Sequence, residues 1–356
     1  MPSLFDPLRL RGLELPHRIM VSPMCQYSSV DGFATDWHLV HLGSRAVGRA
    51  AAVFAEATAV TPDGRISPQD LGIWSDAHIE PLQRAFSFIE RQGSIPGIQL
   101  AHAGRKASTA EPWKGGKPLS LQQGGWTPIF GPSDLPFTDS YQTPQPLSRS
   151  QIQQIVAAFA DAARRAEAAG ARIIELHAAH GYLLHSFLSP LSNQRQDEYG
   201  GTFENRIRIV CETAAAVRKV WPEQLPLFVR ISATDWSEGG WTVEDSVALV
   251  RHLKPLGVDL VDCSSGGTVA GAKIPVGPGY QVAFAEEIRR ATGICTGAVG
   301  MITQPAQADE IIRCGQADVV FLARQFLRDP YWPLIAAREL SHEIQWPLQY
   351  ERAKLK

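Results

Sequence analysis

The sequence predicts a (β/α)8 barrel, and three observations support this fold class. Short apolar runs alternate with longer segments of helical periodicity along the whole chain of 356 residues. No Gly-x-Gly-x-x-Gly motif follows the first apolar run, which disfavours a doubly wound dinucleotide-binding fold. No change in composition divides the chain, so we expect a single domain over residues 1–356.

The expected strands and helices alternate as a closed barrel of parallel strands requires. Short apolar runs predict strands at Arg18–Ser22, Ala52–Ala57, Ile95–Ala101, Arg172–Leu176, Leu227–Ile231, Leu260–Cys263, Ile294–Ala298 and Val319–Leu322. Helical periodicity predicts helices at Asp36–Val47, His78–Arg91, Ser148–Ala169, Thr202–Val220, Thr242–Pro255, Gln281–Ala291, Thr303–Arg313 and Gln325–Arg338. Ser148 and Thr242 are residue types that cap helices, and Asp245 follows Thr242 at the spacing of a capping box.

One segment, at about residues 104–147, does not fit the repeat. It is rich in Pro, Gly, Ser and Trp and has little periodicity. A loop of this length inside a compact domain is usually functional or disordered. Because the segment follows the third strand, we expect an insertion that caps the carboxyl ends of the strands. The C-terminal tail, at about residues 341–356, is predicted to be irregular.

The bulk properties restrict the partners of the protein. The formal net charge is −2 and there is no Lys/Arg run, so we expect no nucleic-acid partner. No apolar run approaches the ~18 residues of a membrane span, so we expect no membrane association. The five cysteines form no CxxC pair, and the first residues lack the features of a signal peptide. Both observations predict a reducing, cytoplasmic location.

His177, His180 and Tyr182 follow a strand-like run between Gly170 and Gly181, where we expect the strand to end. In parallel barrels the carboxyl ends of the strands carry the chemistry. Two neutral imidazoles can donate hydrogen bonds to one oxygen, and an adjacent phenol can supply a proton. The group therefore suits polarising a carbonyl and protonating a neighbouring carbon. The alternatives are a structural histidine pair and a metal site, although no further ligands with the spacing of a metal site accompany the histidines.

The segment Ser22–Pro23–Met24–Cys25–Gln26–Tyr27 ends the first strand. Its backbone groups are placed to hydrogen-bond a planar ring, with Cys25 as a polarizable contact beside the ring. Cys25 is alternatively a small buried hydrophobe, or a nucleophile that needs an activating base. Tyr27 is either a pocket wall or a surface aromatic residue.

Arg230 interrupts an otherwise apolar strand, and Gln99 lies in the third strand. A buried guanidinium is costly without an anionic partner. We expect that partner to be negative charge on a bound cofactor, or a barrel carboxylate such as Glu56 or Glu175.

Glycine-rich turns follow the sixth and seventh strands, and Ala323–Arg324 follows the eighth. Turns at these places commonly bind phosphate through backbone N–H groups. Arg324 would add a fixed, bidentate charge to such a site.

Taken together, these motifs resemble the old yellow enzyme family of flavin-dependent ene-reductases, and within it the bacterial branch called thermophilic-like. The resemblance covers essentially the whole chain. The motifs that carry it are residues 22–27, 56–60 and 99–106, the His177/His180/Tyr182 cluster, and residues 197–201, 204–206, 321–324 and 349–352.

The resemblance implies a TIM barrel that holds non-covalent FMN at its carboxyl end. The cofactor-binding residues that it implies, together with Ser22 from the strand-end segment, are Ser22, Pro23, Met24, Cys25, Ala57, Gln99, Arg230, Gly300, Ala323 and Arg324. Ala323 stands where the family pattern has glycine, so the turn that approaches the phosphate must accommodate a methyl group there. His177 and His180 would hold the substrate carbonyl, Tyr182 would donate a proton, and Tyr27 would shape the pocket.

The implied activity is the reduction of an activated alkene. NADPH or NADH reduces FMN, and the hydride then passes to the β-carbon of an α,β-unsaturated carbonyl or similar compound, with protonation at the α-carbon. The resemblance also implies a homodimer, or a dimer of dimers, in which Arg352 reaches the neighbouring subunit's site. Two other classes remain open at this point: a metal-dependent barrel hydrolase and a non-catalytic flavin-binding protein. Related barrels with an iron–sulfur cluster need closely spaced cysteines, which this chain lacks.

Overall fold

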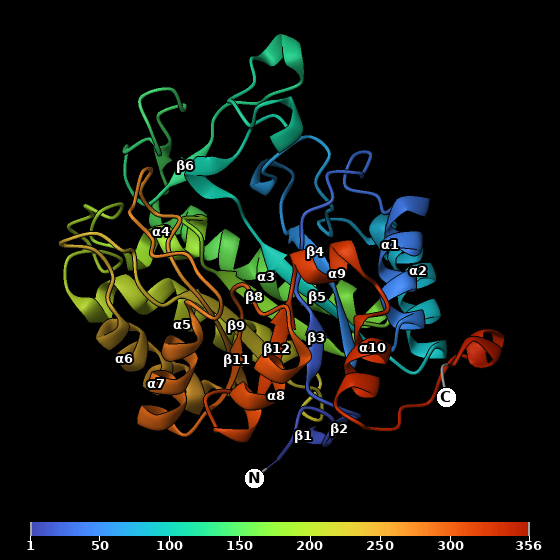
Figure 1. The fold of residues 1–356 in the computed structure, drawn as a ribbon. Helices are drawn as coiled ribbons and strands as arrows, with labels where there is room; N and C mark the ends of the chain where they lie inside the picture. The colour runs from blue at the N-terminus through green and yellow to red at the C-terminus, as the bar shows by residue number, and fades with distance from the viewer. Residues whose placement is uncertain (1, 355–356) are drawn as a thin grey trace.

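The computed structural model describes residues 2–354, and its centre is a closed barrel of parallel strands (Figure 1). In chain order the barrel strands are β3 (Ile19–Val21), β4 (Ala52–Ala59), β5 (Ile95–Ala101), β8 (Ile173–Ala178), β9 (Leu227–Ser232), β10 (Leu260–Ser264), β11 (Cys295–Ala298) and β12 (Val319–Leu322). β12 pairs with β3 and closes the ring, and every ladder of the barrel is parallel. The predicted (β/α)8 barrel is confirmed.

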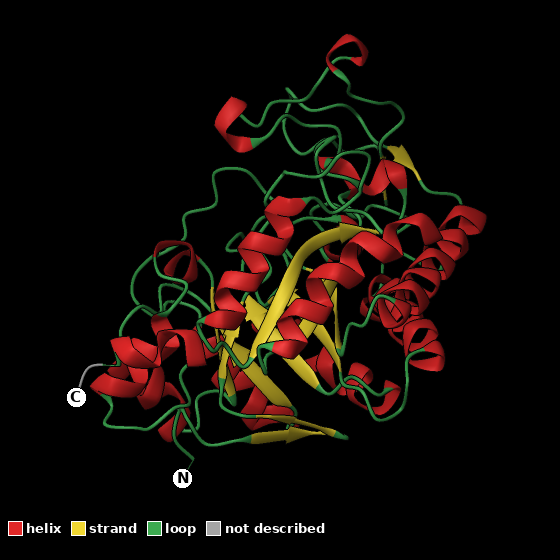
Figure 2. Cartoon of the chain, turned by 90° about the vertical axis from the view of Figure 1, so that its right-hand side faces the viewer, coloured by secondary structure: helices red, strands yellow, loops and turns green. Residues whose placement is uncertain are grey.

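Helices cover the outside of the barrel (Figure 2). They are α1 (Asp36–Val47), α2 (Ile79–Arg91), α3 (Arg149–Ala168), α4 (Leu183–Leu188), α5 (Phe203–Val220), α6 (Val243–Leu253), α7 (Val282–Thr292), α8 (Pro305–Arg313), α9 (Arg324–Arg328) and α10 (Trp332–Glu339). Ser148 and Thr242 cap α3 and α6 as expected, each in a capping box. No helix within residues 2–354 is long and apolar enough to cross a bilayer.

The last predicted helix, Gln325–Arg338, is wrong as a single element. The structure divides it into α9 and α10, with Asp329, Pro330 and Tyr331 between them. Pro330 lacks a backbone N–H and disfavours helical geometry in the residue before it, and Asp329 is indeed extended, with φ −142°. The periodicity continues across the break because both short helices bury an apolar side.

Aromatic rings fill the lower interior of the barrel. Phe54 lies 6.0 Å from Phe228 and 5.8 Å from Phe321 between ring centroids. Two strand glycines make room for these rings, because a Cβ at Gly97 would approach Phe54 to 2.7 Å and one at Gly297 would approach Phe321 to 2.4 Å. Because these rings fill the interior near the amino ends of the strands, the carboxyl end of the barrel is the open end.

The two ends of the barrel are covered differently. A hairpin of β1 (Leu8–Leu10) and β2 (Leu13–Leu15) covers the amino end, at the bottom of Figure 1. The segment after β5 contains β6 (Phe130–Gly131) and β7 (Gln145–Pro146), and it rises above the carboxyl end at the top of the same view. A capping insertion after the third barrel strand is therefore present, as predicted.

Candidate active site

Most of the predicted site residues meet at the carboxyl end of the barrel. The strand register sets Ala57 beside Gln99, and it sets Arg230 between His177 and Asp262. These pairings depend on barrel closure, because each strand is paired with two neighbours. The site is therefore built on rigid strands, with the insertion above it.

His177, His180 and Tyr182 form a compact cluster. The ring of His177 lies 5.1 Å from that of His180 and 5.0 Å from that of Tyr182, with edge-to-face geometry in both pairs. β8 extends two residues beyond the predicted end at Leu176, so His177 lies within the strand and His180 follows it. The cluster brings two imidazoles and a phenol together as the sequence predicts.

The backbone at His180 is held in an unusual conformation. His180 has φ +60°, in the left-handed region that few side chains other than glycine adopt. Its N–H donates to Ser232 Oγ at 2.9 Å, and its carbonyl accepts from Lys106 Nζ at 2.8 Å. Lys106 also donates to the carbonyl of Gly267, so that one ammonium joins the loops after β8 and β10. Burial lowers the pKa of Lys106 to about 7.

Burial keeps the three side chains of the cluster uncharged. It lowers the pKa of His177 and of His180 well below the usual value, and the cation of Arg230 adds to the effect. Burial likewise raises the pKa of Tyr182 well above the usual value. At neutral pH the site thus presents two neutral imidazoles, each with one N–H, and a phenol that keeps its proton.

The loop after β3 is tied to β4 through Glu56. A shift in register at Glu56 lets its carboxylate accept from the backbone N–H of Gln26 at 2.6 Å. The other oxygen of Glu56 lies 3.1 Å from His38 Nε2.

Cys25 lies in the same loop. Burial of its thiol raises the pKa of Cys25 well above its usual value, and the negative charge of Asp70 adds to this effect. A thiol that stays protonated argues against Cys25 as a nucleophile.

Tyr27 belongs to the same loop and is half-buried. Its ring meets that of Trp113 in the insertion at 5.7 Å, edge to face. It therefore lies where the insertion meets the barrel mouth.

The buried cation Arg230 has a carboxylate partner, but neither of the two that we expected. Its Nε lies 3.2 Å from Asp262 Oδ2 on the next strand, and its Nη1 donates to Ser22 Oγ at 3.0 Å. Glu56 instead pairs with His38, and the carboxylate of Glu175 accepts a hydrogen bond from Gln99 at 2.7 Å. Asp262 was missed because its position opposite Arg230 depends on the register of β9 and β10.

A cavity of about 220 Å³ opens beside Arg230, over β11 and β12. Gly300 has φ +124°, and a Cβ there would come within 3.0 Å of Gln281 Nε2. The other residues that line the cavity include Ser264, Tyr280, Gln281, Val299, Met301, Phe321, Ala323, Arg324 and Arg328. The arrangement suits an anionic group, because Arg324 and Arg328 add cations to glycine-exposed backbone.

The structure does not bring Arg352 to this site within one chain. Arg352 lies in a C-terminal 3-10 helix, Leu348–Ala353, at the lower right of Figure 1 and away from the insertion. Sequence reasoning also gave no role to Ser264, Gln281 or Lys106. Lys106 was visible as the last residue of the 99–106 motif, but Ser264 and Gln281 carried no signal.

Fold and site together define a barrel enzyme with an anion-binding cavity next to neutral hydrogen-bond donors. The model of the NADH:flavin oxidoreductase / NADH oxidase family matches residues 3–343. The chain is 51% identical to an NADPH dehydrogenase of Geobacillus thermodenitrificans, over 98% of both chains. It is 48% identical to an NADPH dehydrogenase of Bacillus subtilis, again over 98% of both chains. A solved structure of morphinone reductase superposes with a TM-score of 0.80 at 25% identity, over 97% of this chain and 91% of that one.

The chain therefore belongs to the NADH:flavin oxidoreductase / NADH oxidase family. It is an NAD(P)H-dependent oxidoreductase with FMN as its cofactor. The residues at the barrel mouth fit that cofactor. The buried nitrogen His177 Nδ1 has no hydrogen-bond partner among residues 2–354, and the register places the cation of Arg230 next to His177. The cavity with Arg324 suits a phosphate.

Proposed function

We propose that the protein is an ene-reductase, which uses NADPH or NADH to reduce the carbon–carbon double bond of an α,β-unsaturated carbonyl or similar activated alkene. The observation that carries this proposal is the cluster of His177, His180 and Tyr182. It combines two neutral N–H donors with a protonated phenol whose ring lies 5.0 Å from that of His177. FMN, when bound, supplies the hydride chemistry.

His177 and His180 donate hydrogen bonds to the carbonyl oxygen of the substrate. They withdraw electron density from the β-carbon and stabilise the negative charge that develops on the oxygen. Because both imidazoles are neutral, each acts as a donor and neither takes a full charge into the buried site. Tyr182 donates its phenolic proton to the α-carbon. Tyr27 forms the wall of the pocket toward the insertion.

The proposed cofactor site extends from the loop after β3 to the turn after β12. Ser22, Pro23, Met24 and Cys25 face the ring system, with Ala57 and Gln99 at its polar edge. Arg230 offsets negative charge on the ring, and the phosphate is bound by Gly300, Ala323 and Arg324. Support comes from the cavity that joins Arg230 to Arg324.

A spectrum and a turnover assay test the proposed function. We expect the purified protein to be yellow, with flavin absorbance, and to oxidise NADPH anaerobically beyond one equivalent per FMN only when 2-cyclohexenone is added. A colourless protein that takes up no FMN would remove the cofactor site from the proposal. A yellow protein that never reduces an activated alkene would instead indicate a flavin-binding protein without this activity.

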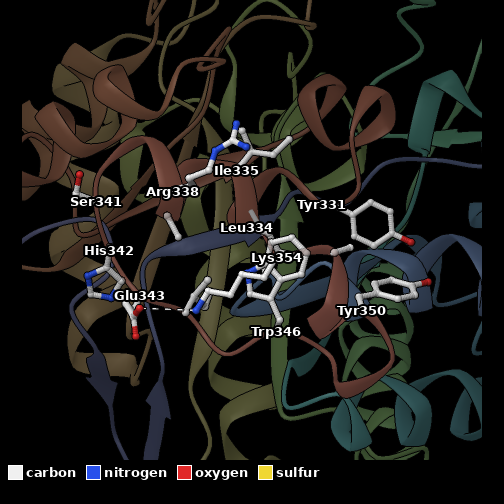
Figure 3. Close-up of a pocket in the computed structure, with 13 residues that line it drawn as sticks. Tyr331, Leu334, Ile335, Arg338, Ser341, His342, Glu343, Trp346, Tyr350 and Lys354 are labelled. Carbon is white, nitrogen blue, oxygen red and sulfur yellow. Dashed lines mark ion pairs between the residues drawn. The ribbon is translucent and has the colours of Figure 1, made fainter. Parts of the chain in front are cut away.

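We further propose that two copies associate through the C-terminal face. A groove of about 730 Å³ lies between α10 and the tail, lined by Leu334, Ile335 and Trp346 among others (Figure 3). Tyr350 of the tail packs on Tyr331 at 5.9 Å between ring centroids. Large apolar side chains remain exposed on this side of the molecule, among them Ile335, Leu348 and Tyr350. A homodimer would cover them and direct Arg352 toward the neighbouring site.

Subunit mixing tests the role of Arg352. We expect Arg352→Ala to raise KM for 2-cyclohexenone by about tenfold to a hundredfold, the effect of one charged hydrogen bond. A mixed dimer of Arg352→Ala with an inactive His177→Ala/His180→Ala chain should regain the wild-type KM. In that dimer the active chain receives Arg352 from its partner. An unchanged KM in the single variant, or no recovery on mixing, would place Arg352 outside the neighbouring site.

We place the enzyme in the cytoplasm. The support is that all five cysteines are free thiols in the structure, as expected of a protein in a reducing compartment.

A further inference from the structure

The backbone of His180 lies directly against the loop that follows β10. A Cβ at Gly267 of that loop would come within 2.6 Å of His180 Cα, so only glycine permits this approach. In the same way, a Cβ at Gly181 would come within 2.2 Å of the carbonyl oxygen of Gly267. The loops after β8 and β10 therefore meet here through their main chains.

Two hydrogen-bonded bridges fasten His180 to this loop, one on each side of the residue. The N–H of His180 donates to Ser232 Oγ at 2.9 Å, and Ser232 Oγ donates to the carbonyl of Gly266 at 2.7 Å. The carbonyl of His180 accepts from Lys106 Nζ at 2.8 Å, and Nζ also donates to the carbonyl of Gly267 at 2.6 Å. The direction of each bond made by Lys106 is fixed, because an ammonium can only donate and a carbonyl can only accept.

The ammonium of Lys106 is fully engaged by protein groups. Two of its three hydrogens are used by the carbonyls of His180 and Gly267. The centroid of the Phe137 ring lies 4.0 Å from Nζ, within the range of a cation–π contact, which accounts for the third. Lys106 ends the 3-10 helix Gly104–Lys106 at the start of the insertion, and Phe137 lies further along the insertion. Any effect of Lys106 on a substrate must therefore pass through the residues that it holds.

We propose that Lys106 is a positioning residue, which holds His180 in the conformation from which its imidazole binds the substrate carbonyl. The φ of His180, +60°, is unfavourable for a residue with a side chain and persists only where contacts hold it. Lys106 and Ser232 supply such contacts, one to the carbonyl and one to the N–H. Without the ammonium the turn can relax and carry the imidazole away from His177. The inference rests on the proposed function, in which His180 is a donor to the carbonyl.

A double-mutant cycle tests whether Lys106 acts through His180. Lys106→Met keeps an unbranched side chain but removes every N–H donor. At about pH 6 it should lower kcat/KM for 2-cyclohexenone by about tenfold to a hundredfold, the effect of a hydrogen bond to a charged group. In the His180→Ala background the same change should cost less than about twofold, because the side chain that Lys106 positions is gone. Each rate is corrected for bound FMN.

The pH profile gives a second measurement. Burial lowers the pKa of Lys106 to about 7, and the positive charge of Arg105 adds to this effect. The ammonium is therefore present at pH 6 and is lost as the pH rises through about 7, together with its attraction to the ring of Phe137. We expect the ratio of kcat/KM between wild type and Lys106→Met to be greatest at pH 6. By pH 9 it should fall by about twofold to fivefold, the loss of a cation–π contact.

The ratio to Lys106→Met isolates the ammonium from the other ionisable groups. Those near it are Arg105, His177, His180 and Tyr182. Burial lowers the pKa of Arg105 only to about 10, holds the pKa of both imidazoles well below the usual value, and holds that of the phenol well above it. None of these groups therefore changes its charge state between pH 6 and pH 9. Buried carboxyls of the barrel that titrate in this range are common to both proteins.

Lys254 offers a matched control. Its ammonium also donates to two backbone carbonyls, those of Thr292 and Gly293, at 2.9 and 3.1 Å, but the residue is exposed and lies between α6 and the start of β10. Lys254→Met should leave both the rate and the pH profile unchanged. If Lys106→Met fails to retain FMN, the cycle is repeated with Lys106→Gln, which keeps two N–H donors and removes only the charge.

Three results would overturn the proposal. They are an unchanged kcat/KM in Lys106→Met at pH 6, an equal loss in the wild-type and His180→Ala backgrounds, and a ratio that is constant from pH 6 to pH 9. Proton NMR of the FMN-loaded enzyme separates this proposal from the proposed function. The imidazole C–H signals of His180, identified by their loss in His180→Ala, should shift in Lys106→Met and not in Lys254→Met, whether or not any alkene is reduced.

Discussion

The His177→Ala/His180→Ala double variant is expected to reduce 2-cyclohexenone at least about a thousandfold less efficiently than the wild type. Removing one donor to a developing oxyanion typically lowers the rate by about 10²–10³. The two imidazoles act on one oxygen, so their effects are not independent. The fold-reduction in rate for the double variant is therefore smaller than the product of the two single-variant reductions. The measurement is kcat/KM for alkene reduction under anaerobic conditions, corrected for bound FMN.

An exposed histidine provides the control for this variant. His252 lies in the last turn of α6 and is open to solvent, so His252→Ala should keep the wild-type rate. The double variant should still bind FMN, because the phosphate cavity and Arg230 are intact. Wild-type turnover by the double variant would show that these histidines do not polarise the substrate.

The second large effect is expected from Arg230→Met. Asp262 and Glu175 are fully buried, and Arg230 is the cation next to them. Removing one partner of a buried ion pair typically costs about 3–5 kcal/mol, because the remaining charge stays buried without compensation. We expect the free energy of unfolding to fall by about 3 kcal/mol at pH 8, where Asp262 of the wild type is ionised, and FMN binding to weaken strongly. Denaturant unfolding and flavin titration measure the two effects.

The stability loss of Arg230→Met should depend on pH. Burial raises the pKa of Asp262 to about 6 and that of Glu175 to about 8, and Arg230 opposes both shifts. Without the cation both values rise further, so the folded variant holds these protons to higher pH. A carboxyl with a raised pKa contributes stability at low pH that is lost as the pH rises through the folded pKa. The gap between variant and wild type should therefore be small at pH 5 and widen above about pH 6.

A surface arginine gives the matched control. Arg84 pairs with Asp36 at 2.9 Å, and both side chains are mostly exposed. Arg84→Met should change stability very little at any pH, since exposed pairs are screened by water. If Arg230→Met is as stable as Arg84→Met at pH 8, Arg230 does not compensate the buried carboxylates.

Much of the fold could be predicted from the sequence because it depends on local patterns. Buried parallel strands are continuous apolar runs, and helices repeat every 3.6 residues, so the alternation of the two is visible in the chain. Errors occurred where a local rule competed with that pattern. Pro330 broke an apparently continuous helix, and β8 ran on past Leu176 to include His177.

The candidate site was predictable only in part, for a related reason. His177, His180 and Tyr182 lie close together in the chain, so their meeting needed no knowledge of other strands. The carboxylate predicted to pair with Arg230 was wrong, because the actual partner, Asp262, becomes its neighbour only through the pairing of β9 with β10. Glu56 and Glu175 were equally reasonable from sequence, and each is bound by another side chain.

By itself, the sequence determined the strand–helix alternation, the capping insertion and the chemical groups at the strand ends. Those properties depend on residues near each other in the chain. Only the tertiary structure decided that Asp262 faces Arg230, that Ser264 contacts His180, and that burial keeps both imidazoles neutral. Charge state and hydrogen-bond partner depend on which distant strands become neighbours, and closure of the barrel sets that register.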